Sequence, residues 1–233
     1  MQLRLESRPV GEVVVIQCHG RIVSGNEVFT LHAQVGDSLD KYGDVVLQLD
    51  DVEFVDSSGL GALVRLMQSA RAKGGDLKLS GVPERIRKTL QMTGLLSQFE
   101  TYDTVEEAIT AAYLGSRYSR CKAGDARPRM LCVCESTDVG TFLREVLCGA
   151  GYNSMIVATV DDARILLKAT KAKLVVISAR MQSVHGRTTR KTLEEIDPAV
   201  SLLVLDDNFA SQDPGEAAEK LLSSVGTLLP VSE

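Results

Sequence analysis

The strongest structural signal in the sequence lies in residues 45–70, where a buried strand passes directly into an amphipathic helix. The run 45–49, VVLQL, is largely apolar, as in a strand that is covered on both faces, and acidic residues follow it. From Leu60 onwards, apolar side chains recur at helical intervals. Between the two elements lies the sequence DSSG, residues 56–59. This direct succession of strand and helix is typical of an α/β domain.

The first half of the chain predicts α and β elements mixed around one sheet. Strands at 3–8 and 12–20 flank a Pro-Gly turn and form an antiparallel hairpin. A helix over 25–41 follows, with Ser24 or Asn26 available as its cap. The helix after DSSG ends at two consecutive glycines. A strand at 76–82 and a helix at 83–90 come next. A turn at 92–99 then leads to a short strand, and the last helix lies at 104–113.

The second half has a different pattern, in which apolar strands alternate strictly with helices. Residues 115–128 are rich in charge, Gly and Pro without periodicity and predict a linker. The chain therefore divides into a domain at 1–114, this linker, and a domain at 129–233. Continuous apolar strands between helices predict a parallel sheet that is covered on both faces. The predicted strands of this half lie at 129–136, 153–158, 173–180 and 200–207. The predicted helices lie at 139–150, 161–170, 188–196 and 214–225.

Composition narrows the range of functions. A net charge of -5 gives no electrostatic footprint for nucleic acid, so we expect no direct DNA binding. The apolar runs are far shorter than the roughly 20 residues that span a bilayer, and the N-terminus lacks a signal-peptide core. Five irregularly spaced cysteines favour reduced thiols, and no CxxC or Cys/His cluster indicates a metal site. We expect a cytoplasmic protein without membrane insertion, cofactor or metal.

Two further motifs match known signatures only weakly. Residues 36–39, GDSL, have the four letters of a serine hydrolase motif, but they fall inside a helical pattern. None of the three histidines has an Asp three residues before it, as that signature requires. Residues 20–27 have the glycine spacing of a phosphate-binding loop, with Asn26 in place of the required lysine. Both matches are best explained by chance.

The DSSG sequence leaves three interpretations open. Asp56 or a serine can act as a helix cap, which is worth about 1 kcal/mol, although capping needs only one such residue. A catalytic nucleophile would need a base within hydrogen-bonding distance, and no histidine lies near in sequence. A phosphate acceptor needs only an exposed hydroxyl, because the catalytic acid and metal can come from a partner kinase.

Three segments, FVDSSGLGALVRL, GGDLKLSGV and LQMTGLLSQF, resemble the STAS fold of bacterial anti-sigma factor antagonists over about residues 1–113. The resemblance implies that Ser57 is phosphorylated by an anti-sigma factor that is itself a GHKL-type serine kinase. It also implies that the unmodified protein binds this kinase through the loop and the helix from Ser58 to Lys73, and so frees a sigma factor. The implied partner-binding residues are Asp56, Ser58, Gly59, Leu60 and Gly61.

The second half resembles a response-regulator receiver, a flavodoxin-like parallel α/β domain, over about residues 128–226, with its last unit short or missing. The chemical groups of a receiver are absent. Cys134 and Glu135 occupy the places of the acidic pair, Ser178 that of the phospho-accepting aspartate, and Asp206 that of the Thr/Ser. One carboxylate does not make the divalent-metal site. We expect a degenerate receiver that serves protein contacts.

The sequence therefore predicts a two-domain regulator that is not itself an enzyme. Its partner is an anti-sigma factor kinase, and the second domain docks or forms a homodimer. The alternative is a non-phosphorylated STAS scaffold or adaptor in a signalling or transport complex, with DSSG as a cap and contact surface only. A nucleotide-binding or small-molecule-binding STAS domain and a serine hydrolase rank below these.

Overall fold

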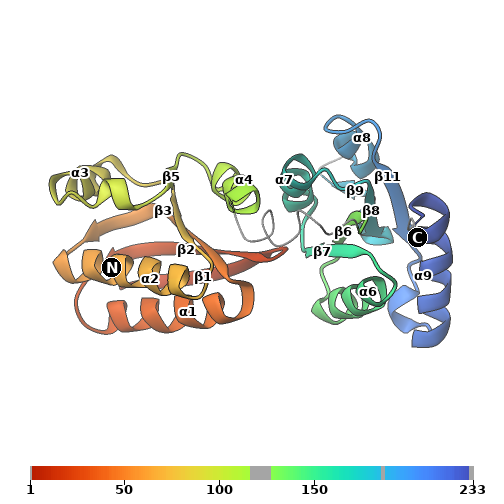
Figure 1. Cartoon of the computed structure of the whole chain (residues 1–233), viewed down its shortest axis with the longest axis horizontal. Helices are drawn as coiled ribbons and strands as arrows, with labels where there is room; N and C mark the ends of the chain where they lie inside the picture. Colours follow the sequence, from red (N-terminus) through yellow and green to blue (C-terminus); the bar gives the residue numbers. More distant parts are fainter. Residues whose placement is uncertain (1, 116–126, 185–186, 231–233) are drawn as a thin grey trace. The chain divides into compact units, whose positions relative to one another are not determined.

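The computed structural model describes residues 2–115, 127–184 and 187–230. The chain divides into two compact units, Met1–Lys122 and Ala123–Glu233 (Figure 1). Most of the predicted linker, residues 116–126, lies outside the described residues.

The first unit is built on a five-stranded sheet with the order β1-β2-β3-β4-β5. β1 and β2 form the predicted antiparallel hairpin, and β2 to β5 run parallel to one another. The strands are β1 (Arg4–Val10), β2 (Val13–Ile22), β3 (Asp44–Val55), β4 (Leu77–Ser80) and β5 (Thr101–Tyr102). β3 extends through the acidic residues that follow its apolar run, so the sheet reaches the DSSG sequence directly.

The helices of the first unit cover both faces of this sheet. They are α1 (Asn26–Tyr42), α2 (Ser57–Ala72), α3 (Glu84–Met92) and α4 (Val105–Gly115), with a short 3-10 helix η1 (Leu96–Gln98). α1 and α2 lie side by side, and their buried leucines share one core with alternate residues of β2 and β3 (Figure 1). The Tyr113 hydroxyl fixes α4 to the hairpin, because it donates to the Val10 carbonyl (3.0 Å) and accepts from the Glu12 N–H (2.7 Å).

The predicted cap of the first helix is wrong. Gly25 is the N-cap residue of α1, with a φ of 112°, and no side chain accepts a cap hydrogen bond there. Glycine adopts this backbone conformation without strain. The Ser24 N–H is instead bound by Asp56, which lies 32 positions along the chain.

The second unit contains a four-stranded parallel sheet in the order β11-β8-β6-β7 within the described residues. Numbered along the chain and read from β7 to β11, this order is 2-1-3-4, the same as the first four strands of the flavodoxin-like order 2-1-3-4-5. The strands are β6 (Arg129–Val133), β7 (Asn153–Val157), β8 (Leu174–Ser178) and β11 (Ser201–Leu205). The helices are α6 (Thr137–Gly149), α7 (Val160–Thr170), α8 (Thr189–Glu194) and α9 (Pro214–Leu228). The remaining elements are β9 (Ser183–Val184), β10 (Arg187–Thr188), η2 (Ala179–Met181) and η3 (Phe209–Ser211).

A buried tyrosine ties the last helix to this sheet. The Tyr152 hydroxyl, at the start of β7, donates to the Leu229 carbonyl at the end of α9 (3.0 Å). We expect Tyr152→Phe to lower the free energy of unfolding of the second unit by about 1 kcal/mol, because one buried hydrogen bond is lost. Thermal unfolding followed by circular dichroism would show a melting temperature lower by about 4–8 °C. Tyr42→Phe, whose hydroxyl makes no hydrogen bond to the described residues, should leave it unchanged.

Candidate functional site

The first candidate site is the junction between β3 and α2. Asp56 is the N-cap residue of α2, and its Oδ1 accepts a hydrogen bond from the Gly59 N–H (2.7 Å). The Asp56 N–H donates to the Ile22 carbonyl at the end of β2 (3.2 Å). The loop is therefore held both to its own helix and to the neighbouring strand.

The second carboxylate oxygen of Asp56 binds a different segment. Oδ2 accepts from the Ser24 N–H in the turn after β2 (2.9 Å). These hydrogen bonds, that from Ser24 first and that from Gly59 next, lower the pKa of Asp56 because they stabilise the ionised form. One ionised side chain thus fixes the relative position of two loops.

Ser57 is the first residue of α2, and its side chain is exposed. Because Asp56 accepts the cap hydrogen bond, the Ser57 hydroxyl is not needed for capping. In the described part of the chain Ser57 Oγ has no hydrogen-bond partner. Ser58 is half-buried. The structure therefore presents one of the two hydroxyls to solvent at a helix N-terminus.

The residues after Ser58 pack against the sheet and the core, and so fix the position of this loop. A Cβ atom at Gly59 would lie 2.3 Å from the Ile22 carbonyl oxygen, so only glycine allows α2 to approach β2 this closely. Leu60 is buried in the domain core, and Gly61 is half-buried. A direct contact of Gly59 or Leu60 with a partner is not supported by this burial. We expect these two residues to act by positioning the loop.

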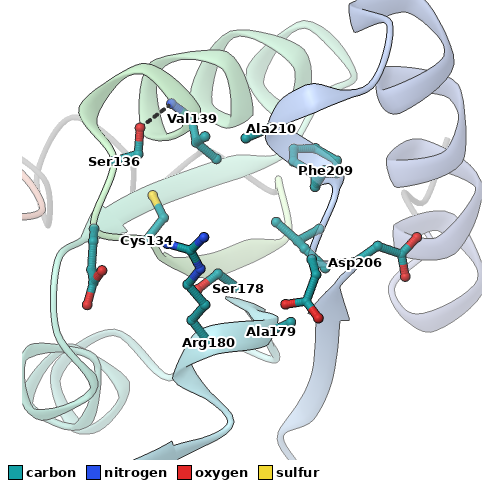
Figure 2. A pocket seen from close by; sticks show the side chains of 12 residues that line it. Cys134, Ser136, Val139, Ser178, Ala179, Arg180, Asp206, Phe209 and Ala210 are labelled. Atoms are coloured by element: carbon teal, nitrogen blue, oxygen red, sulfur yellow. Dashed lines mark hydrogen bonds between the residues drawn. The ribbon is translucent and has the colours of Figure 1, made fainter.

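A second candidate site is a pocket of about 170 Å³ in the second unit (Figure 2). Cys134, Glu135, Ser178 and Asp206, which the receiver resemblance aligned one by one, all line it. They lie at the carboxyl ends of β6, β8 and β11, where open α/β sheets bind ligands. Arg180 and Phe209 also line the pocket, and Ser136 caps α6 beside it by accepting from the Val139 N–H (3.4 Å).

Comparison with known proteins identifies the first unit. Residues 4–108 match the family model of the STAS domain. A Thermotoga neapolitana protein, a TM1081 homolog named as a candidate anti-sigma factor antagonist, is 37% identical over 68 residues, which are 29% of this chain and 60% of that protein. The anti-sigma F factor antagonist of Paenibacillus polymyxa is 33% identical over 66 residues, 28% of this chain and 56% of that protein. The first unit is a STAS domain.

The solved structure of Bacillus SpoIIAA in its phosphorylated form is also similar to the STAS domain. The two sequences are 27% identical. The match covers 46% of this chain and 96% of the SpoIIAA chain, with a TM-score of 0.38. The chain spans about 60% of the length of the first relatives that it matches. The family match ends at residue 108, before the second unit begins. No helix among the described residues is both long and apolar enough to traverse a bilayer.

The pocket residues of the second unit differ chemically from a receiver's acidic site. Burial raises the pKa of the Cys134 thiol, which therefore remains protonated at neutral pH. Asp206 forms an ion pair with Lys220 of α9. Ser178 offers a hydroxyl where a receiver has a carboxylate. Cys132 of β6 and Cys134, which directly follows that strand, belong to the same hydrophobic core.

The other motifs occupy structural positions. Ser38 of GDSL lies within α1, and its hydroxyl donates to the Gln34 carbonyl (2.8 Å). His19 pairs with Asp51 on the neighbouring strand (3.1 Å). Sequence reasoning missed the link between Asp56 and Ser24, since the two residues belong to separate turns and no local pattern connects them.

The cap of the STAS domain makes a testable contribution to stability. We expect Asp56→Ala to lower the free energy of unfolding by about 1–2 kcal/mol, because two backbone N–H groups lose their acceptor. The pKa of Asp56 is lowered on folding, so this stability is present above the unfolded pKa of about 3.9 and is lost as the pH falls through the folded value.

The measurement is the melting temperature of wild type and Asp56→Ala from pH 7 down to about pH 3. The two curves should converge at the acidic end. Asp37→Ala, at an exposed position within α1, is the control and should show no such pH-dependent difference. A constant gap between wild type and Asp56→Ala would contradict the assignment of the effect to the ionised cap.

Proposed function

We propose that this protein is an anti-sigma factor antagonist of the phosphorylation-switched kind. Its STAS domain binds an anti-sigma factor that is a GHKL-type serine kinase, and phosphorylation of Ser57 by this kinase releases the complex. The protein itself is not an enzyme and acts in the cytoplasm on transcription, through the sigma factor that is set free.

The observation that carries the proposal is the position of Ser57. Its hydroxyl is exposed, has no hydrogen-bond partner in the described structure, and is not needed for the cap. A helix N-terminus also accommodates added negative charge, with a gain of about 0.3–1 kcal/mol. The modification can therefore change a binding surface without damaging the fold.

The relatives support the choice of partner. The Paenibacillus polymyxa protein is named for antagonism of the anti-sigma F factor, and the matched Bacillus subtilis protein for antagonism of the anti-sigma-B factor. The STAS family match covers residues 4–108, which include Ser57. The transfer of an anti-sigma partner to this chain rests on that similarity.

For the second unit we propose a receiver-like domain that does not accept phosphate and serves protein contacts, homodimerisation among them. The support is the strand order and the residues at the pocket. Cys134, Glu135, Ser178 and Asp206 meet at the carboxyl ends of the strands but provide a thiol and a hydroxyl in place of two carboxylates. A divalent cation prefers a larger set of oxygen ligands.

The test is intact-mass measurement after incubation with ATP and purified GHKL-type serine kinases. Wild type should gain the mass of one phosphate, Ser57→Ala should gain none, and Ser58→Ala should still gain one. Modification at Ser58, or none with any kinase that binds the protein, would contradict the proposal. The second outcome would favour the non-phosphorylated scaffold.

A further inference from the structure

Three side chains cluster beside the DSSG sequence, residues 56–59, which we call the Ser57 loop. None of the three makes a hydrogen bond that holds this loop in place. The guanidinium carbon of Arg21 lies 5.4 Å from the centre of the Phe54 ring, and that of Arg85 lies 5.7 Å from the same centre. Phe54 is 36% exposed, and both arginines are exposed. We refer to Arg21, Phe54 and Arg85 as the Arg-Phe-Arg patch.

The fold places these residues together from three elements. Arg21 and Phe54 are register partners on the parallel strands β2 and β3. Arg85 lies in the first turn of α3. A cation in the first turn of a helix is unfavourable for the helix dipole, so helix stability does not explain Arg85. Each guanidinium can attract the ring face, and the pair holds Phe54 at the surface.

The two arginines lack counter-charges at ion-pair distance. Among the described residues, neither Arg21 nor Arg85 has a carboxylate within 4.0 Å. By contrast, Arg71 pairs with Asp76 (3.2 Å) and Arg87 with Asp103 (3.6 Å) in the same unit. The patch thus presents two guanidinium groups around an apolar ring, neither with a carboxylate within 4.0 Å among the described residues, on a chain of net charge -5. Asp56 acts on Arg21 only from a greater distance. The complement of the patch is a surface with carboxylates beside an apolar side chain.

We propose that the Arg-Phe-Arg patch binds an acidic segment of the protein that docks on the Ser57 loop. Glutamate or aspartate side chains of that segment pair with Arg21 and Arg85, because a guanidinium binds a carboxylate in bidentate fashion. An apolar side chain between them covers Phe54. This inference rests on the proposed function, since the occupant is a part of the same partner.

The patch and Ser57 belong to one surface. Ser57 lies three positions after Phe54 along the chain, so their Cα atoms are at most about 11 Å apart. Arg21 also contributes to the lowered pKa of Asp56, the residue next to Ser57. The separation of Phe54 and Ser57, at most about 11 Å, is comparable to the Debye length of about 8 Å at physiological ionic strength, so salt only partly screens a charge on Ser57 from the patch. A phosphate on Ser57, with about -1.5 to -2 charges, would therefore reduce the attraction of the patch for carboxylates.

The first experiment uses a fixed probe, the peptide acetyl-Glu-Glu-Leu-Glu-Glu-amide, against the full-length protein with ¹⁵N-labelled arginine. The Nε–H resonances of Arg21 and Arg85 should shift on titration, and the shifts should weaken as NaCl is raised from about 50 to 300 mM. The same peptide with Gln in place of Glu is the control ligand. Equal shifts with both peptides would overturn the proposal.

Variants of the protein assign the effect to the patch. Arg21→Gln and Arg85→Gln should each weaken peptide binding about 1.5- to fivefold, the range expected for an exposed ion pair. Lys88→Gln removes the same charge from the same helix, where Lys88 pairs with Glu84 (3.6 Å), and should leave binding unchanged. All three variants should stay folded, with melting temperatures at most a few degrees below that of wild type, because an exposed cation–π contact or ion pair contributes little to stability. Unchanged peptide binding in both arginine variants would overturn the proposal.

The second experiment measures the affinity of these variants for the kinase that modifies Ser57. Weaker binding of Arg21→Gln and Arg85→Gln, with Lys88→Gln as tight as wild type, supports the patch as part of the interface. Phosphorylation of Ser57 together with unchanged kinase binding in the arginine variants refutes the patch and leaves the proposed function intact. Peptide binding without phosphorylation by any kinase refutes the function and leaves the patch as an acidic-segment site.

Discussion

Ser57→Asp is expected to weaken binding of the proposed anti-sigma factor partner more than a hundredfold while leaving the fold intact. Ser57 is exposed at the N-terminus of α2, and a partner carboxylate about 5 Å away would cost about 3 kcal/mol per unit charge at an effective dielectric of 20. That free energy corresponds to more than a hundredfold in the dissociation constant. Isothermal titration with the purified anti-sigma factor measures it directly.

Ser57→Asn is the control that separates the effect of the added charge in Ser57→Asp from the effect of the larger side chain, since asparagine has nearly the volume of aspartate. This variant carries a neutral side chain of similar volume, and we expect it to bind within about threefold of wild type, since neutral surface substitutions cost little. The melting temperature of Ser57→Asp should equal or slightly exceed that of wild type, because the helix dipole favours an anion at this position. Tight binding by Ser57→Asp, or equally weak binding by both variants, would contradict a charge-based switch.

The order of helices and strands was predictable because it depends on local periodicity. The strand that contains the apolar run 45–49 and the helix predicted from Leu60 onwards were correct: they lie within β3 and α2. A short apolar run before a turn indicates a buried strand, and a 3.6-residue repeat indicates a helix. The predicted cap of α1 failed for a different reason. Its Ser24 N–H is bound by Asp56 from a distant turn, and the chain reverses at Gly25. Tertiary hydrogen bonds of this kind have no local signature.

The candidate sites also divide into those with a local sequence pattern and those that only the tertiary structure brings together. Asp56 and Ser57 stood out because adjacent polar residues interrupt two apolar patterns. The Arg-Phe-Arg patch did not, because its members come from β2, β3 and α3 and are ordinary surface residues in each element. The four pocket residues of the second unit were found one at a time by alignment with a known pattern. Their convergence depends on the parallel order of β6, β8 and β11.

Gly59→Ala is expected to lower the free energy of unfolding of the STAS domain by about 3 kcal/mol, at the upper end of the range for overpacking a core. The new Cβ would lie 2.3 Å from the Ile22 carbonyl oxygen and 2.8 Å from Val55 Cγ1. The carbonyl is backbone and cannot rotate away, so α2 must move off the sheet. Urea denaturation at several temperatures measures the change, with the second unit as an internal reference.

Gly36→Ala is the matched control, because Gly36 lies within α1 and a Cβ there meets no atom within 4 Å. Alanine is the better helix former, so this variant should be more stable than wild type by about 0.5–1 kcal/mol. The opposite signs of the two glycine substitutions would isolate the contact with Ile22. If Gly59→Ala also stabilised the domain, the close approach of α2 to β2 would be wrong. The position of Ser57 on its surface, which depends on that approach, would then have to be revised.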